Sequence, residues 1–266
     1  MMKRVITGVL SAAYVIAMVL LGRTAMLLNM GIVLLLGTYE MLDTLSSGGM
    51  KPIKWVYYVY AAALIPAYVF FAEKGLLIAV MVGMLVFMAM ASVRTEPDAK
   101  QLLGALLPAF YPALPLMALV MLICNDGPFW RMLVWLTFAL SVGSDVCALY
   151  AGKFFGKRKL IPQVSPNKTV EGAYGGIAGS VIAALVIYFI TFFRGEGLNV
   201  WMFIGLGIVG SLVTQLGDIT ASYIKRFCGA KDFGKIFPGH GGLLDRLDGV
   251  MFSAVSMCIF MMITGF

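Results

Sequence analysis

The sequence predicts an all-α, polytopic integral membrane protein with about nine transmembrane helices, a cytoplasmic N-terminus and an external C-terminus. Hydrophobic residues make up 61% of the 266 residues, and the mean hydropathy is +0.94, whereas soluble domains are nearer half apolar. The apolar residues form successive segments of about 20 residues, the length that crosses a bilayer. Basic residues are concentrated in alternate connections between these segments, as expected when Lys and Arg stay on the cytoplasmic side.

The apolar segments follow one another along the whole chain. The first begins after Lys3 and Arg4 and resembles a signal peptide, but it has no convincing small-residue cleavage site, so we interpret it as an uncleaved helix. Pro108, Pro112 and Pro115 recur at helical spacing in the fifth segment and predict a kink there. The predicted helices span roughly residues 5–22, 24–45, 54–72, 75–93, 101–123, 130–153, 170–193, 200–224 and 245–265.

The charge distribution gives the orientation. Of the 20 Lys and Arg residues, 16 fall in connections predicted to be cytoplasmic. The other four are Arg23, Lys74, Arg131 and Arg194. The two long basic connections, 153–169 and 225–245, then face the cytoplasm, where nucleotides are found. The net charge of +7 therefore suits membrane orientation and anionic membrane partners rather than nucleic acid.

Composition also limits the architecture. The four cysteines show no CxxC pairing and predict neither a disulfide framework nor a zinc site. No internal repeat or soluble domain is apparent. We predict a division into residues 1–128, a scaffold of five helices that could provide lipid access or oligomer contacts, and residues 129–266, four helices that carry a cytoplasmic-side catalytic site.

Several acidic residues lie within or near the apolar segments. Glu40 and Asp43 are near the end of the second; either could touch a site, but we expect helix-end acids that reach the membrane interface. Asp145 lies well inside the sixth segment, where a carboxylate costs on the order of 3 kcal/mol. We therefore predict a functional partner for Asp145, with a nearby lysine as the structural alternative. Asp218 is the second acid at membrane depth.

The stretch from Ser222 to Gly249 is densely charged in a chain of which only 12% is charged. Asp218, Ser222 and the pair Lys225-Arg226 have the spacing that places them on one face of a helix end. The next residues are Lys231 and Asp232, a glycine-rich turn around His240, and finally Asp245, Arg246 and Asp248. Cations and backbone amides suit phosphates, and carboxylates suit magnesium. The pattern predicts phosphoryl chemistry; a solvated loop that only fixes topology is the alternative.

These residues resemble the signature of the phosphatidate cytidylyltransferases, or CDP-diacylglycerol synthases. The segment Ser165-Pro166-Asn167-Lys168-Thr169, followed by Glu171-Gly172, resembles a second block of the same family, and Asp145 matches the acid upstream of it. The resemblance covers about residues 140–250. The signature positions that this chain fills are Ser222, Lys225, Arg226, Lys231, Asp232, Gly234, Pro238, His240, Gly241, Gly242, Asp245, Arg246 and Asp248.

The resemblance implies an enzyme that transfers CMP from CTP to phosphatidic acid, giving CDP-diacylglycerol and pyrophosphate. The implied catalytic residues are Asp218, Lys225, Arg226, His240, Asp245, Arg246 and Asp248. The implied substrate-binding residues are Asp145, Ser165, Lys168, Glu171, Ser222, Lys231, Asp232, Gly241 and Gly242. The implied ligands of Mg²⁺ are Asp218, Asp245 and Asp248, and a second cation could assist.

The expected location is the inner membrane, and the expected partners are CTP, phosphatidic acid and membrane lipids, with no nucleic acid. The chain could also form a homodimer. Two alternatives stay open. A cytidylyltransferase could act on an ether-lipid or isoprenoid phosphate, and a transporter would also carry charges at membrane depth. A transporter more usually shows repeat symmetry in both halves, whereas the polar residues here are confined to the second half.

Overall fold

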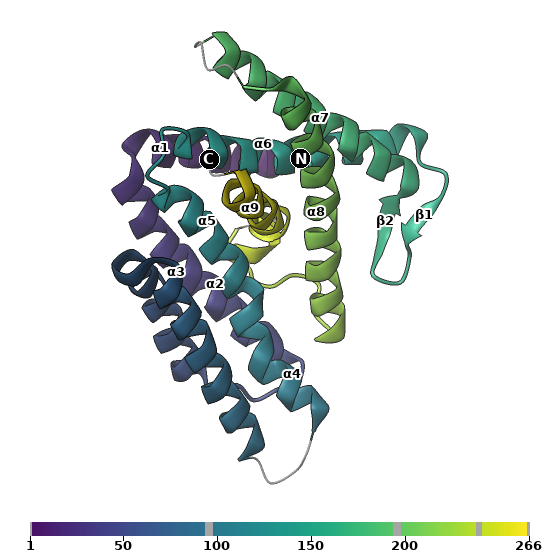
Figure 1. Cartoon of the computed structure of the whole chain (residues 1–266). Coiled ribbons are helices and arrows are strands. Elements are labelled where there is room, and N and C mark those ends of the chain that lie inside the picture. Colours follow the sequence, from purple (N-terminus) through teal and green to yellow (C-terminus); the bar gives the residue numbers. More distant parts are fainter. Residues whose placement is uncertain (1, 94–97, 194–197, 238–240, 265–266) are drawn as a thin grey trace. The chain divides into compact units, whose positions relative to one another are not determined.

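The computed structural model describes residues 2–93, 98–193, 198–237 and 241–264 (Figure 1). Within this part of the chain, seven helical segments are long and apolar enough to cross a membrane, so the protein is a polytopic integral membrane protein. The predicted total of nine and the orientation of the termini stay predictions. The elements are α1 (Met2–Leu21), α2 (Arg23–Ser47), α3 (Lys54–Ser92), α4 (Ala99–Pro108), the π-helical turn η1 (Ala109–Ala113), α5 (Leu114–Cys124), α6 (Trp130–Phe155), β1 (Lys159–Ile161), β2 (Ser165–Thr169), α7 (Val170–Phe193), α8 (Val200–Phe227) and α9 (Leu244–Thr264).

The chain forms two compact units that interleave along the sequence. The first unit consists of Met1–Cys124 and Lys225–Arg246, and the second consists of Asn125–Ile224 and Leu247–Phe266. The first unit therefore contains α1 to α5 together with the connection between α8 and α9. The predicted domain division after residue 128 stays a prediction.

In the first unit, α2 packs against α3 and α5, and α3 packs against α4 (Figure 1). Helix α3 is not one straight rod, because the backbone at Ala72 is non-helical. The ring of Tyr57 stacks on Phe87 at 4.5 Å, and Tyr60 meets the same ring edge-on at 5.2 Å. Thirty residues of straight helix would separate such rings by about 45 Å. The two halves of α3 therefore fold back on each other, as the predicted helices 54–72 and 75–93 require.

The predicted kink in the fifth apolar segment is confirmed. Pro108 ends α4, Pro112 lies in η1, and Pro115 lies in the first turn of α5. Each proline removes a backbone donor from the helix, and Tyr111 adopts extended backbone angles of φ −141° and ψ 117° inside η1. Residues Ala99–Cys124 are also the most buried of the seven candidate membrane spans. The irregular backbone is thus enclosed by protein, where it is tolerated within a membrane.

In the second unit, α6 and α7 pack closely along a series of small residues. A Cβ atom at Gly179 would overlap Cys147 and the carbonyl oxygen of Gly143, and one at Gly175 would overlap Ala151. Small residues at helical spacing let two backbones approach without side chains between them, which drives helix association in membranes. This contact fixes the C-terminal half of α6 beside the N-terminal half of α7.

The predicted all-α fold holds for the membrane spans, but the connection between α6 and α7 contains a short antiparallel hairpin (Figure 1). Strand β1 pairs with β2, with Lys159 opposite Thr169 and Ile161 opposite Ser165. The sequence prediction missed these strands because Pro166 and Asn167 are poor strand residues. A two-stranded hairpin has only edge strands, where a proline is tolerated.

Candidate active site

The predicted site residues fall into two sets, one in each unit. In the first unit, the carboxylate of Asp245 organises the connection that precedes α9. Its Oδ1 accepts a hydrogen bond from Lys225 Nζ at 2.6 Å. Its Oδ2 accepts from the backbone amides of Phe233 at 2.8 Å and Gly242 at 2.9 Å. Asp245 therefore binds the end of α8 and two points of the connection at once.

The ion pair of Lys225 and Asp245 is buried. The two side chains are 11% and 5% exposed, and the Lys225 ammonium also lies 5.2 Å from the centre of the Phe233 ring. The two buried charges compensate each other, and removing either one would leave an uncompensated buried charge. In contrast, Arg226 is exposed and donates to the carbonyl oxygen of Ala230 at 3.2 Å. Of these two cations, Arg226 is the exposed one.

Glu40 belongs to the same set, although the sequence favoured a helix-end acid over a residue that touches the site. The expectation of a helix-end acid at the membrane interface is wrong for Glu40, whose side chain is buried. Asp43 is exposed, and its place at the interface stays a prediction. The Glu40 carboxylate accepts from the backbone amides of Leu243 at 2.9 Å and Leu244 at 2.8 Å. It therefore caps the N-terminus of α9 from another helix, and it satisfies amides that have no partner within α9.

In the second unit, the ammonium of Lys168 lies 2.5 Å from Asp218 Oδ2. Lys168 comes from β2 and Asp218 from α8, so this pair joins the two sequence blocks singled out above. Lys168 Nζ makes no hydrogen bond of good geometry to any of the described residues. The Lys168 and Asp218 side chains are 22% and 34% exposed. This pair is therefore less enclosed than that of Lys225 and Asp245, although the Lys168 nitrogen itself is buried, and the lysine has donors left for a ligand.

The start of α7 positions Lys168. Thr169 precedes the helix, and its Oγ1 accepts from the backbone amide of Gly172 at 3.1 Å, as an N-cap residue does. The predicted start of a helix at residue 170 is confirmed. Glu171 Oε2 accepts from the backbone amides of Lys157 at 3.0 Å and Arg158 at 3.2 Å. Glu171 thus ties the end of α6 to the start of α7.

Helices α6, α8 and α9 meet near the remaining acids. A Cβ at Gly217 would lie 2.6 Å from the carbonyl oxygen of Asp248, and one at Gly249 would lie 3.7 Å from Asp145 Oδ2. Asp248 Oδ1 accepts from the backbone amide of Gly249 at 2.8 Å. Asp218 is the neighbour of Gly217 on α8. The glycines thus bring the backbones that carry Asp145, Asp218 and Asp248 together.

The other predicted residues have simpler surroundings. Lys231, Asp232 and Arg246 are exposed, and Ser165 and Ser222 are half-buried. Gly241 has a positive φ of 81°, which glycine adopts readily. The Gly242 amide, predicted to help bind phosphate, donates to Asp245 instead. The predicted residues Pro238 and His240 lie outside the described part of the chain.

The predicted Mg²⁺ ligands fit a cation unequally. Asp218 fits well, because it is partly exposed and, among the described residues, no donor contacts its Oδ1. Asp248, on α9, is half-buried, and one of its oxygens already accepts a hydrogen bond from a backbone amide. Both oxygens of Asp245 are used by Lys225 and two amides. Among the described side chains, no three His, Cys, Asp or Glu residues form a ready-made metal-binding group.

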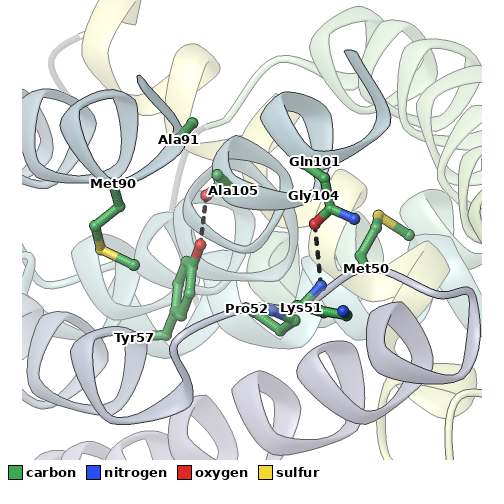
Figure 2. Close-up of a pocket in the computed structure, with 9 residues that line it drawn as sticks. All are labelled: Met50, Lys51, Pro52, Tyr57, Met90, Ala91, Gln101, Gly104 and Ala105. Atoms are coloured by element: carbon green, nitrogen blue, oxygen red, sulfur yellow. Dashed lines mark hydrogen bonds between the residues drawn. The ribbon is translucent and has the colours of Figure 1, made fainter. Parts of the chain in front are cut away.

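A pocket in the first unit does not involve these residues. Figure 2 shows it between Met50, Lys51, Tyr57 and Gln101, with Tyr57 donating to the Ala105 carbonyl at 2.9 Å and the Lys51 amide donating to Gln101 at 3.1 Å. Its volume of about 10 Å³ is room for about one water molecule. The pocket is therefore a packing gap and not a substrate site.

Comparison with known proteins identifies the family of the chain. The family model described as "Cytidylyltransferase family" matches residues 2–264. The chain belongs to this family. The match includes both units and both sequence blocks, so the cytidylyltransferase family resemblance of residues 140–250 extends over nearly the whole chain.

Curated relatives are also similar over part of their length. The chain is 47% identical over 122 residues to a phosphatidate cytidylyltransferase of Staphylococcus aureus strain COL, covering 46% of this chain and 43% of the relative. It is 45% identical over 121 residues to the one of Staphylococcus haemolyticus, covering 46% and 43%. The one of Staphylococcus epidermidis strain RP62A is 44% identical over 124 residues, covering 47% and 44%. The chain thus spans less than half the length of the curated relatives it matches.

Proposed function

We propose that this protein transfers CMP from CTP to phosphatidic acid, producing CDP-diacylglycerol and pyrophosphate. Membership of the cytidylyltransferase family and similarity to the phosphatidate cytidylyltransferases of Staphylococcus support the reaction class and the substrates. We further propose the inner membrane as the location and the cytoplasm as the side of the reaction. The unequal distribution of basic residues supports both.

The pair of Lys168 and Asp218 is the observation that carries the proposal. A triphosphate brings several negative charges, which need cations, and its counter-cation needs carboxylate oxygens. Lys168 and Asp218 offer one group of each kind, 2.5 Å apart and partly exposed. When the nucleotide binds, Lys168 can turn its unused donors to a phosphate oxygen, and Asp218 is then released to bind a cation.

In this reaction the protein mainly positions charged groups. A phosphate oxygen of phosphatidic acid attacks the α-phosphorus of CTP and forms a new P–O bond. The bond from that phosphorus to the bridging oxygen breaks, and pyrophosphate leaves with the electron pair. Few covalent tasks fall to side chains in such reactions, so alignment and charge stabilisation dominate. The exposed guanidiniums of Arg226 and Arg246 are suited to grip phosphate oxygens in pairs.

Asp218 and Asp248 are the residues that would hold Mg²⁺, with Asp218 the better fit. Bound Mg²⁺ would neutralise part of the triphosphate charge during the reaction. Asp245 would become a ligand only if Lys225 moved away, because both of its oxygens are already used. We therefore assign Asp245 first to holding the connection before α9.

The test uses the purified chain with Mg²⁺, labelled CTP and a panel of phosphatidic acid, an ether-lipid phosphate and an isoprenoid phosphate. We expect labelled CDP-diacylglycerol with phosphatidic acid and little product with the others. A preference for another lipid phosphate would replace the substrate, and no lipid product with any of them would refute the proposal.

A matched pair of variants tests the role of Lys168 in its pair with Asp218. Lys168→Gln removes the cation beside Asp218 and should lower kcat/KM for CTP about tenfold or more, as expected for the loss of one charge-assisted hydrogen bond. Lys157→Gln removes an exposed lysine from the same connection and should leave kcat/KM within about twofold. Equal values in the two variants would contradict the role of Lys168.

A further inference from the structure

One face of α2 lies along the connection between α8 and α9. Three of its residues, Gly37, Glu40 and Thr44, and its C-cap residue Gly48 contact this connection or the first residue of α9. They recur at i, i+3, i+7 and i+11, so they form one stripe on a helix. We call these four residues the α2 stripe. All its contacts lie within the first unit.

The two ends of the α2 stripe require small residues. A Cβ at Gly37 would lie 3.0 Å from Leu244 Cδ2, and one at Gly48 would lie 3.0 Å from the Cα of Cys228. Between these ends, the Thr44 hydroxyl donates to two carbonyl oxygens, that of Glu40 within α2 at 2.9 Å and that of Phe233 in the connection at 3.2 Å. The connection is therefore held along about three turns of α2, from Cys228 at one end to Leu244 at the other.

Glu40 is the only charged member of the α2 stripe, and it is 1% exposed. A carboxylate buried this deeply loses its hydration, which must be replaced by hydrogen bonds. The amides of Leu243 and Leu244 provide two of them. A Cβ at Gly234 or Gly242 would overlap the Glu40 carboxylate, so the connection closes around Glu40 with glycines.

Two carboxylates thus share the backbone amides of this connection. Glu40 takes the amides of Leu243 and Leu244, and Asp245 takes those of Phe233 and Gly242. Negative groups are favourable at a helix N-terminus, where the macrodipole is positive. If Glu40 released its two amides, the first turn of α9, which carries Asp245, would lose these hydrogen bonds to α2.

We infer that Glu40 is a positioning residue that anchors the connection and the first turn of α9, keeping Asp245 and Lys225 in place. The consequence for turnover rests on the function proposed above. Glu40 is too enclosed to touch a substrate, and it acts through the backbone that it holds. The first half of the chain therefore contributes to the site through one buried acid on α2.

The test compares Glu40→Gln with Asp43→Asn, an exposed acid on the same helix. Glutamine keeps the size of Glu40 but turns an NH₂ donor toward one of the two amides. Hydrogen exchange is measured on peptides that contain Leu243 and Leu244, and kcat is measured per folded molecule after size-exclusion chromatography. We expect about tenfold faster exchange and about tenfold lower kcat in Glu40→Gln, with Asp43→Asn matching the parent.

Each outcome decides the inference. Unchanged exchange in folded Glu40→Gln would refute the anchor. Faster exchange with an unchanged kcat would show a purely structural contact and would also refute the positioning role, while the proposed reaction would stand. A parent enzyme that makes no lipid product would refute the proposed function, and hydrogen exchange alone would then decide the anchor. If Glu40→Gln does not fold, Thr44→Val, which removes the hydroxyl that donates to the carbonyl oxygens of Phe233 and Glu40, should show the same two changes at about threefold.

Discussion

Removing Lys225 tests the buried ion pair most simply. Lys225→Met keeps the length and apolar stem of the side chain but deletes the ammonium that lies 2.6 Å from Asp245. Asp245, 5% exposed, would keep two amide donors and lose its counter-charge. Its neighbours cannot replace that charge without opening the connection to water.

The size of the effect follows from burial. Deleting one partner of a buried pair destabilises a protein by about 3–5 kcal/mol. In chains of roughly this size, 1 kcal/mol lowers the Tm by about 2–4 °C. We therefore expect Lys225→Met to lower the Tm by roughly 6 °C or more. The matched control is Lys54→Met, because Lys54 pairs with Asp43 at 3.9 Å with side chains 45% and 61% exposed, and exposed pairs contribute about 0–1 kcal/mol.

The assay is thermal unfolding of the two variants and the parent in the same detergent, followed by intrinsic fluorescence and by loss of monodisperse protein. A Tm of Lys225→Met within about 2 °C of both the parent and Lys54→Met would refute the reasoning. That result would mean that Asp245 is hydrated or neutral, and that the pair does not hold the connection together.

Three further predictions follow from other parts of the chain. Gly179→Ala should destabilise the protein by about 1–3 kcal/mol, because its Cβ would overlap α6. The control Gly205→Ala, with no atom within 4 Å of the new Cβ, should be neutral or stabilising, and equal Tm values for the two variants would contradict the α6–α7 packing. Burial raises the pKa of the Cys228 thiol, and Lys100 only partly offsets this shift. At neutral pH, maleimide should therefore label Cys228 far more slowly in the folded than in the denatured protein, and equal labelling rates would contradict the burial of this thiol. A reporter fused after Phe266 should report the external side, and a cytoplasmic signal would mean that one span is miscounted.

Much of the fold follows from hydropathy and from the charged, glycine and proline residues that bound or interrupt the apolar segments. The ends of α6, α7, α8 and α9 lie within a few residues of the predicted ones, because the apolar segments there are bounded by charges and glycines. The break at Ala72 and the proline kink were also predictable, since length and proline spacing specify both. The β1–β2 hairpin was not predictable from strand propensity, because its pairing depends on turn geometry and on the start of α7.

The site was predictable only where its residues are close in sequence. The spacing from Asp218 to Asp248 indicated phosphoryl chemistry, and the nearby block identified Lys168. Glu40 was missed because its partners, Leu243 and Leu244, lie more than 200 residues away in sequence. The small-residue spacing from Gly37 to Gly48 around Glu40 was the available signal, and it indicates close approach by another segment without saying which one.

The transfer of the α-phosphorus of CTP tests the central claim most directly. The purified chain, with Mg²⁺ and phosphatidic acid in mixed micelles, is given CTP labelled either at the α-phosphorus or at the γ-phosphorus. A cytidylyltransferase must place the α-label in the lipid product and the γ-label in pyrophosphate, in equal amounts, and Asp218→Asn should abolish both. A γ-label in the lipid would show phosphoryl transfer instead, and an unlabelled lipid with either nucleotide would contradict the proposed reaction.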